Sequence, residues 1–171
     1  ISNSEGASVS IQEGQFVSAN SLGFIGGFPT SRHYLSCAVI AGSGESMQRD
    51  DWYSTARDPA AIESAETIGR MAAQRALTRI GARKIKTCKV PVIFEAPLAA
   101  ALIGSFVHAV SGGSLYRKTT FLADSLGQRV FSKRVNISER PHLSRALASS
   151  YFDNDGVATQ DREVLVAGRL Q

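Results

Sequence analysis

The stretch "PLAAALIGSFVHAVSG", residues 97–112, decides the fold class more than any other part of the sequence. Pro97 fits the first turn of a helix, and the residues after it are apolar on nearly every side of that helix. The apolar run is shorter than the roughly 20 residues that span a bilayer. We therefore expect a helix that is buried in a core.

A second helix is predicted upstream, over residues 58–80. Asp58 is a favourable N-cap, Pro59 suits the first helical position, and Gly81 can end the helix in a left-handed conformation. Glutamates near its start and arginines near its end complement the helix dipole. The two main helices are thus expected at about 58–80 and 97–110.

Short alternating runs bounded by turn residues fill the rest of the chain and predict antiparallel strands. The predicted elements are a hairpin at 7–19 that turns at Glu13-Gly14, a loop at 20–31, strands at 33–41, 47–54 and 90–96, a hairpin at 119–131, a short helix within 139–150, a tight turn at 153–156 and a strand at 157–166. With the two helices, they predict an α+β fold made mostly of antiparallel strands and hairpins.

The composition is that of a globular protein. The chain has 171 residues, of which 43% are hydrophobic and 20% are charged, which is typical of a folded core rather than of disorder. Cys37 and Cys88 form no Cys-x-x-Cys pair, so neither a disulfide framework nor a zinc ribbon is expected, and the cytoplasm is the default location. The chain begins at Ile1 without a signal segment, and we interpret it as a piece of a longer protein.

A basic cluster begins within the upstream predicted helix, at 58–80, and continues past its end, and the net charge of the chain is +4. This balance permits contact with nucleic acid, but no aromatic residue lies within the cluster and no nucleic-acid-reading motif surrounds it. Because cations are favoured at helix C-termini, we interpret the cluster as a solvated face. Its members are Arg70, Arg75, Arg79, Arg83, Lys84, Lys86 and Lys89.

His108 is the one candidate metal ligand on the second helix. A helical zinc site needs a second ligand on the same face, as in His-Glu-x-x-His. Gly104 and Ala101 lie four and seven residues before His108, and neither can bind a metal. A lone histidine on an apolar helix is more typical of a core residue whose ring is hydrogen-bonded, so no metal site is expected.

Several long motifs resemble the TldD/PmbA family, on its PmbA (TldE) side. They are "SRHYLSCAVIAGSGESMQRD" at 31–50, "RALTRIGARKIKTCKVPVIFEA" at 75–96, "APLAAALIGSFVHAVSGGSLYRKTTFLADSLGQRVF" at 96–131 and "ISERPHLSRALASSYFDNDGVATQDREVLVAGRL" at 137–170. The resemblance covers essentially the whole chain. It implies that residues 1–89 end an N-terminal or middle α+β region and that residues 90–171 begin the C-terminal TldD/PmbA-type domain.

The resemblance implies a cytoplasmic heterodimeric zinc metalloprotease that cleaves unfolded or leader peptides, as in microcin precursor maturation and antitoxin degradation. In the TldD-type subunit, the equivalent helix carries His-Glu-x-x-x-His, and a cysteine elsewhere completes the zinc site. In this chain, the three positions are Gly104, Ser105 and Ala109. The resemblance therefore implies no catalytic or metal-binding residue here, no cofactor in this chain, and zinc in the TldD-type partner.

Peptide contact is predicted at the glycines and the polar cluster after the second helix. Glycines let a peptide backbone approach closely, and a nearby strand edge could accept an extended peptide. The alternative, which we favour, is a helix C-cap followed by a solvated turn. The predicted peptide-binding residues are Gly112, Gly113, Tyr116, Arg117 and Lys118.

Two other functions stay open at this point. One is a regulatory protein that binds DNA gyrase or DNA, as the family's older label, "modulator of DNA gyrase", suggests. The other is an independent hydrolase, for which no recognisable spacing of catalytic residues is present. The expected partners are a TldD-type subunit and a peptide, with no membrane and no nucleic acid, and a homodimer of the isolated subunit is left open.

Overall fold

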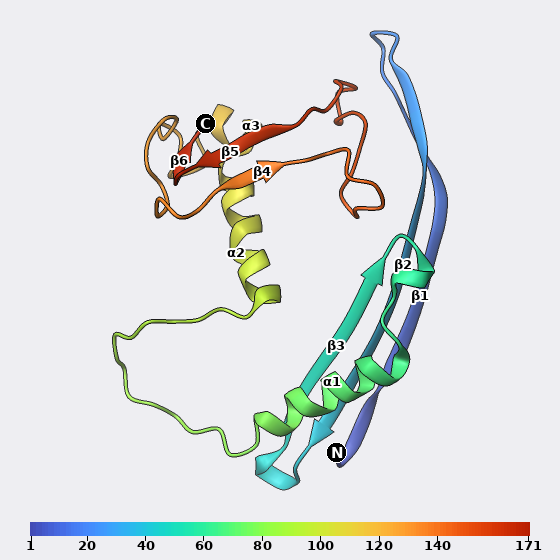
Figure 1. Ribbon diagram of the computed structural model, residues 1–171, viewed down its shortest axis with the longest axis vertical. Coiled ribbons are helices and arrows are strands. Elements are labelled where there is room, and N and C mark those ends of the chain that lie inside the picture. Colours follow the sequence, from blue (N-terminus) through green and yellow to red (C-terminus); the bar gives the residue numbers. More distant parts are fainter. The chain divides into compact units, whose positions relative to one another are not determined.

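The protein divides into two compact units in a computed structural model that describes residues 1–171. The first unit comprises residues 1–84 and 140–160, and the second comprises residues 85–139 and 161–171. Two antiparallel three-stranded sheets and two main helices form the fold (Figure 1), which confirms the predicted α+β class. No helix has the length and apolarity that crossing a membrane requires.

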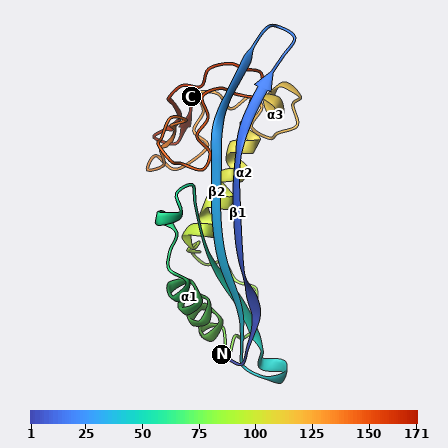
Figure 2. The same ribbon diagram turned by 90° about the vertical axis from the view of Figure 1, so that its right-hand side faces the viewer.

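A long antiparallel sheet, in the strand order β1-β2-β3, forms the first unit. Figure 2 shows β1 and β2 running side by side as one extended ribbon. The side-chain carbonyl of Asn20 closes the turn between them, accepting hydrogen bonds from the N–H groups of Leu22 and Phe24 at 2.9 and 3.2 Å. The strands are β1 (Asn3–Ala19), β2 (Ile25–Ala41) and β3 (Gln48–Ala56).

The predicted hairpin at 7–19 and loop at 20–31 are wrong. Glu13 and Gly14 lie within β1, opposite Ser31 and Thr30 of β2. The chain turns instead at Asn20, whose side chain supplies the hydrogen bonds that a Glu-Gly turn would lack. The predicted strands at 33–41 and 47–54 are confirmed as parts of β2 and β3.

Helix α1 (Ala65–Thr78) covers one face of this sheet. Ala72 and Ala76 are fully buried against Val39 and Ala41 of β2, and such small side chains let the helix approach the strands closely. The helix begins later than predicted, because Ser64 is its N-cap.

Asp58 instead caps a separate short 3-10 turn, Pro59–Ala61, accepting a hydrogen bond from the N–H of Ala60. The capping signal at Asp58 was therefore real, but it belongs to a different element. Gly81 has a φ of +76°, as expected of a residue just past a helix end.

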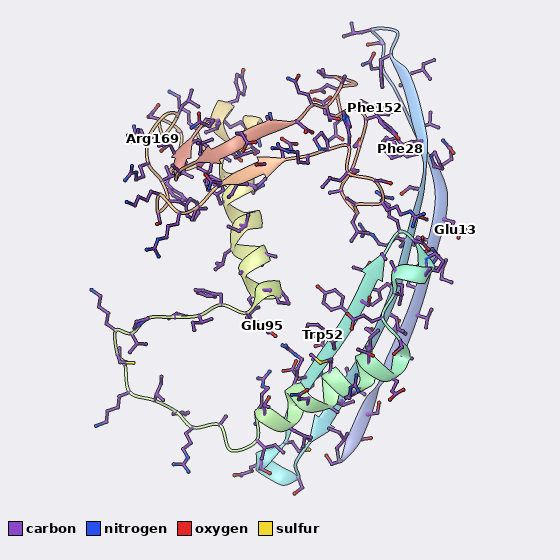
Figure 3. All side chains as sticks on the ribbon, viewed as in Figure 1. Glu13, Phe28, Trp52, Glu95, Phe152 and Arg169 are labelled. Atoms are coloured by element: carbon purple, nitrogen blue, oxygen red, sulfur yellow. The ribbon has the colours of Figure 1, made fainter.

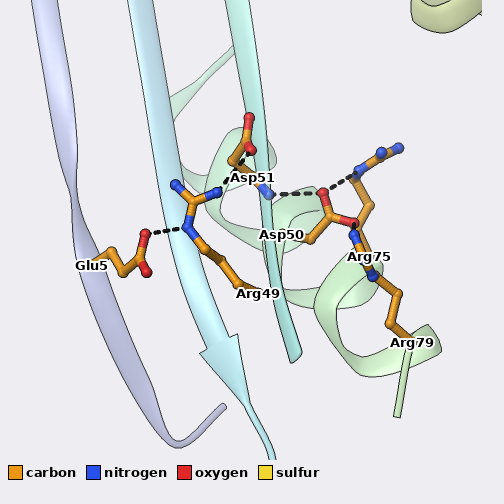
Figure 4. Close-up of polar contacts among 6 residues, drawn as sticks. All are labelled: Glu5, Arg49, Asp50, Asp51, Arg75 and Arg79. Atoms are coloured by element: carbon orange, nitrogen blue, oxygen red, sulfur yellow. Dashed lines mark hydrogen bonds and ion pairs between the residues drawn. The ribbon is translucent and has the colours of Figure 1, made fainter. Parts of the chain in front are cut away.

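Asp50 of β3 ties α1 to the sheet (Figure 4). Its carboxylate accepts hydrogen bonds from Arg75 at 3.1 Å and from Arg79 at 3.3 Å, and the Arg75 guanidinium lies 5.2 Å from the ring centroid of Trp52. Two members of the predicted basic cluster are thus held in ion pairs with the sheet.

The environment of Asp50 also changes its ionisation. Burial alone would raise the pKa of its carboxyl group. The hydrogen bonds from the Asp51 N–H, Arg75 and Arg79 outweigh burial, so the net pKa is lowered from the ordinary value of 3.8.

We predict that Asp50→Asn lowers the free energy of unfolding by about 1–3 kcal/mol near neutral pH, because two guanidinium groups lose their ionic acceptor. Since the folded pKa is lowered, the contribution of Asp50 is complete above the unfolded pKa and is lost as the pH falls through the folded pKa. The variant should therefore lose less stability on acidification. Asp51→Asn is the control, because it removes only an exposed ion pair in which the Asp51 carboxylate lies 3.8 Å from the Arg49 guanidinium. Denaturant unfolding across a pH series measures the free energy of unfolding and its change on acidification. Equal losses of stability in Asp50→Asn and Asp51→Asn would contradict this role of Asp50.

The second unit packs one helix against a small sheet with the order β4-β5-β6. Its core consists of Phe106, Leu122, Leu165 and Leu170. The elements are α2 (Ala96–Ala109), α3 (Gly112–Tyr116), β4 (Ile137–Glu139), β5 (Arg162–Val166) and β6 (Arg169–Leu170).

Helix α2 forms where it was predicted but is far less buried than expected. Only Phe106 is buried, whereas Leu98 and Leu102 are 59% and 50% exposed. One stripe of the helix packs against the core of this unit. The remaining faces are also apolar, but no other segment covers them. Composition alone therefore overestimated the burial of α2.

Several smaller predictions for the rest of the chain also need correction. Residues 90–96 form no strand before α2 begins, residues 119–131 make turns and one bridge rather than a hairpin, and residues 139–150 contain no helix. The strand predicted at 157–166 begins only at Arg162. The tight turn at 153–156 is confirmed, and the Asp153 carboxylate closes it by accepting from the N–H groups of Asp155 and Val157.

Residues 140–160, here called the clasp, join β4 to β5 and pack on the long sheet of the first unit. Phe152 of the clasp lies 5.7 Å from Phe28 of β2 and 4.9 Å from Phe24, measured between ring centroids. Figure 3 labels Phe28 and Phe152 at this contact.

Candidate functional site

The resemblance to the TldD/PmbA family implies that the key positions are Gly104, Ser105 and Ala109. All three lie on the C-terminal half of α2. A Cβ atom built on Gly104 would meet no atom within 4 Å. Ser105 donates its hydroxyl hydrogen bond to the carbonyl of Ala101 one turn back, at 3.1 Å. Ala109 packs against the core of the second unit. None of these groups supplies the nitrogen, sulfur or carboxylate ligand that zinc requires, and none can act as a carboxylate base.

An apolar cavity of about 260 Å³ adjoins two of these positions. Its only polar side chain is Ser105, whose hydroxyl group is already hydrogen-bonded. Phe106 forms one wall and meets Phe131 edge-to-face at 5.0 Å. The lining consists of Leu102, Ser105, Phe106, Ala109, Phe121, Leu122, Val130 and Phe131. This surrounding does not fit a zinc ion, which requires nitrogen, sulfur or carboxylate ligands.

The histidines and cysteines do not gather elsewhere. His108 is exposed, which corrects the prediction that it is a core residue. His33 is buried in the long sheet, and His142 of the clasp lies 3.1 Å from the hydroxyl of Thr159. No group of three or more His, Cys, Asp or Glu side chains is arranged to hold a metal ion.

The predicted peptide-contact residues lie in and just after α3. Gly112 and Gly113 begin this short helix rather than cap α2, which ends at Ala109 with Val110 as its C-cap. The favoured C-cap interpretation is therefore wrong. A Cβ on Gly112 would meet no atom within 4 Å, whereas one on Gly113 would lie 3.2 Å from the Arg117 guanidinium. Tyr116 is 90% exposed.

A groove of about 700 Å³ lies within the second unit, between the C-terminal end of α2, α3 and the small sheet. Of the five predicted residues, only Gly112 lines it. Its lining is mostly apolar, with the Glu139–Arg162 ion pair and a 2.6 Å hydrogen bond from Ser138 to Glu163 among its polar groups. The lining comprises Val107, Val110, Ser111, Gly112, Leu115, Leu122, Ala123, Leu126, Ile137, Ser138, Glu139, Arg162, Glu163, Val164, Leu170 and Gln171.

Sequence reasoning missed the strand residues of this groove. Ile137 and Val164 line it together, although they are 27 positions apart in the chain. Their strands pair as Ile137↔Leu165 and Glu139↔Arg162, and β4 is only three residues long. No periodic pattern can develop in a strand that short, so the sequence contained no usable signal.

Comparison with known protein families divides the chain in two. Residues 1–80 match the PmbA/TldA metallopeptidase central domain, and residues 87–171 match the PmbA/TldA metallopeptidase C-terminal domain. The chain belongs to the PmbA/TldD family. It is similar to the metalloprotease PmbA homolog of Haemophilus influenzae, with 43% identity over the whole chain, and to metalloprotease PmbA of Escherichia coli O157:H7, with 42% identity over 99% of the chain. The chain spans 38% of the length of each of these relatives.

Solved structures share the fold of this chain. A proposed modulator of DNA gyrase from Bacteroides thetaiotaomicron has a TM-score of 0.88 and 27% identity over 96% of this chain, and 38% of that protein is covered. A second, from Thermotoga maritima, has a TM-score of 0.82 and 28% identity over 92% of this chain and 36% of that one. TldE from Thermococcus kodakarensis shares the fold at a TM-score of 0.72 and 19% identity, over 96% of this chain and 37% of that one. This chain is thus a PmbA homologue within a metalloprotease family.

The local scaffold of these positions depends on Phe106, which is 8% exposed. We predict that Phe106→Ala lowers the free energy of unfolding by about 3–4 kcal/mol, because it leaves a void in the core. Phe121→Ala is the matched control, because Phe121 lines the same cavity but is 89% exposed. Calorimetric melting of the full-length variants makes the comparison. A stability loss from Phe121→Ala as large as that from Phe106→Ala would contradict the described packing.

Proposed function

We propose that this chain is part of a non-catalytic subunit that completes a peptide-cleaving zinc metalloprotease together with a TldD-type partner. The observation that carries the proposal is the chemistry of Gly104, Ser105 and Ala109, which offers no metal ligand and no base. The family match and the similarity to metalloproteases of the PmbA type support it. The partner subunit, in the cytoplasm, would hold the zinc ion.

The role proposed for this subunit is to help hold the peptide. The groove of the second unit has an apolar wall and a sheet with β4 at one edge, which is a suitable template for an extended peptide. Gly112 lines the groove with open space at its Cβ position. Tyr116, Arg117 and Lys118 would act at its approaches. Apolar side chains of an unfolded or leader peptide could pack on the wall, while backbone groups pair with the strand.

The division of labour gives the first test. The isolated full-length protein should contain no stoichiometric zinc and should not cleave peptides. The mixture with its TldD-type partner should contain zinc and should cleave peptides. Elemental analysis and cleavage of an unfolded test peptide measure this. Stoichiometric zinc together with peptidase activity in the isolated protein would disprove the non-catalytic role.

The groove gives the second test. We predict that Gly112→Leu raises the KM of the heterodimer for peptide by on the order of tenfold and leaves kcat nearly unchanged, because a side chain would fill space used for binding and not for chemistry. Gly69→Leu in α1 is the control, since its Cβ position is also open but lies in the other unit. If both variants leave KM unchanged, the peptide does not pass Gly112.

A further inference from the structure

The clasp is a 21-residue excursion whose two ends continue directly into strands of the groove. Glu139 ends β4, Arg162 begins β5, and these two residues are opposite each other in the sheet. Residues 137–139 and 162–164 line the groove. Residues 140–160 also fall within the range matched by the C-terminal domain, yet they pack on the sheet matched by the central domain. One connection therefore belongs to both domains.

Arg57, just after β3, holds the clasp at its centre. Its guanidinium donates from Nε to the carbonyl of Ala146 and from Nη2 to the carbonyl of Leu147, both at 2.8 Å. On the sheet side, Nη1 donates to the Thr30 hydroxyl at 2.8 Å and to the Ser31 carbonyl at 3.3 Å. All four acceptors are neutral, so the planar fork of arginine is used to cross-link two segments and not to balance a charge.

The backbone of Arg57 is fixed as well. The hydroxyl of Ser31 donates to the Arg57 carbonyl at 2.8 Å, so the strand that accepts from the guanidinium also holds its main chain. A second link, between Arg145 and Asp58 at 2.6 Å, lies on the surface, where the Arg145 side chain is 74% exposed. Such exposed pairs contribute little. The Asn20 amide makes one hydrogen bond to the clasp, to the Asp155 carbonyl at 3.1 Å, whereas Arg57 makes two and is therefore the principal polar anchor.

Aromatic packing holds the C-terminal part of the clasp against the first two strands of the long sheet and the turn between them. Phe152 contacts Phe24 and Phe28, and a Cβ on Gly26 would lie 2.8 Å from the Phe152 ring. Gly156, at a φ of +85°, leaves no room for a Cβ beside Phe24, at 2.6 Å. Between this aromatic packing and Arg57, a cavity of about 310 Å³ remains, lined by Phe28, Arg57 and clasp residues. The clasp is thus held at two points with space between them, so that loss of one point can free part of it.

We propose that the clasp couples the long sheet to the groove strands β4 and β5, and that Arg57 is a positioning residue that keeps those strands in their binding geometry. Released from Arg57, the clasp would pass its motion along the covalent chain into β4 and β5, and the groove would lose its defined wall. The effect on peptide binding rests on the proposed function, whereas the effect on the strands does not.

The experiment uses the full-length protein and the variants Arg57→Ala, Arg57→Lys and Arg145→Ala. Amide hydrogen exchange should become faster by on the order of tenfold in residues 143–150 and also in 137–139 and 162–165 for Arg57→Ala. Arg57→Lys should resemble Arg57→Ala, because an ammonium group cannot make the forked contact. Arg145→Ala should resemble the unchanged protein. Melting and circular dichroism identify any variant that fails to fold, and Arg57→Lys then provides the comparison.

The same variants in the complex with the TldD-type partner separate binding from chemistry. Arg57→Ala should raise KM for peptide severalfold with kcat unchanged, since the zinc chemistry belongs to the partner. Faster exchange confined to the clasp, with β4, β5 and KM unchanged, would overturn the coupling. Unchanged exchange everywhere would overturn the anchoring by Arg57. If the complex cleaves no peptide, the proposed function fails, and the exchange of β4 and β5 still decides the coupling.

Discussion

The antiparallel pairing of β1 with β2, from Asn3↔Ile40 to Ala19↔Ile25, is the constraint on which the first unit depends. Successive side chains of a strand point to opposite faces. On β2, Val39 and Ala41 therefore face α1, while Phe28 faces the clasp. A register slip of one residue would exchange these faces and lose both contacts. The turn that Asn20 closes thus determines where two other segments can pack.

Because the clasp packs on this sheet and continues into β4 and β5, the strands that form the groove also depend on the β1–β2 pairing. The clasp is a loop of the β4–β5 hairpin, yet Arg57 and Phe28 of the first unit hold it. A substitution far from the groove in sequence can therefore affect its walls. In the second unit, Ser105 and Ala109 of α2 line an apolar cavity, and Gly104 has open space at its Cβ position.

The sequence predicted the α+β class and both helices, because the Gly81 stop signal and the apolar run of α2 act locally. The Asp58 capping signal placed the start of α1 too early, because Asp58 caps a separate turn. The sequence misplaced the first turn, because Glu13-Gly14 has turn composition while the actual turn relies on a side-chain bond made by Asn20. It overestimated the burial of α2, since apolar composition does not say which faces find a neighbour. The groove walls and the Arg57 anchor join residues 27 and 89 positions apart, and local patterns cannot reveal such contacts.

The central claim is that the α2 helix of this chain supplies no metal chemistry to the enzyme it completes. Native mass spectrometry of the assembled heterodimer tests it most directly, because it counts zinc ions per complex and, after gentle dissociation, per subunit. We predict one zinc ion per heterodimer, retained by the TldD-type subunit. Two zinc ions per heterodimer, or a zinc ion retained by the subunit that contains this chain, would contradict it.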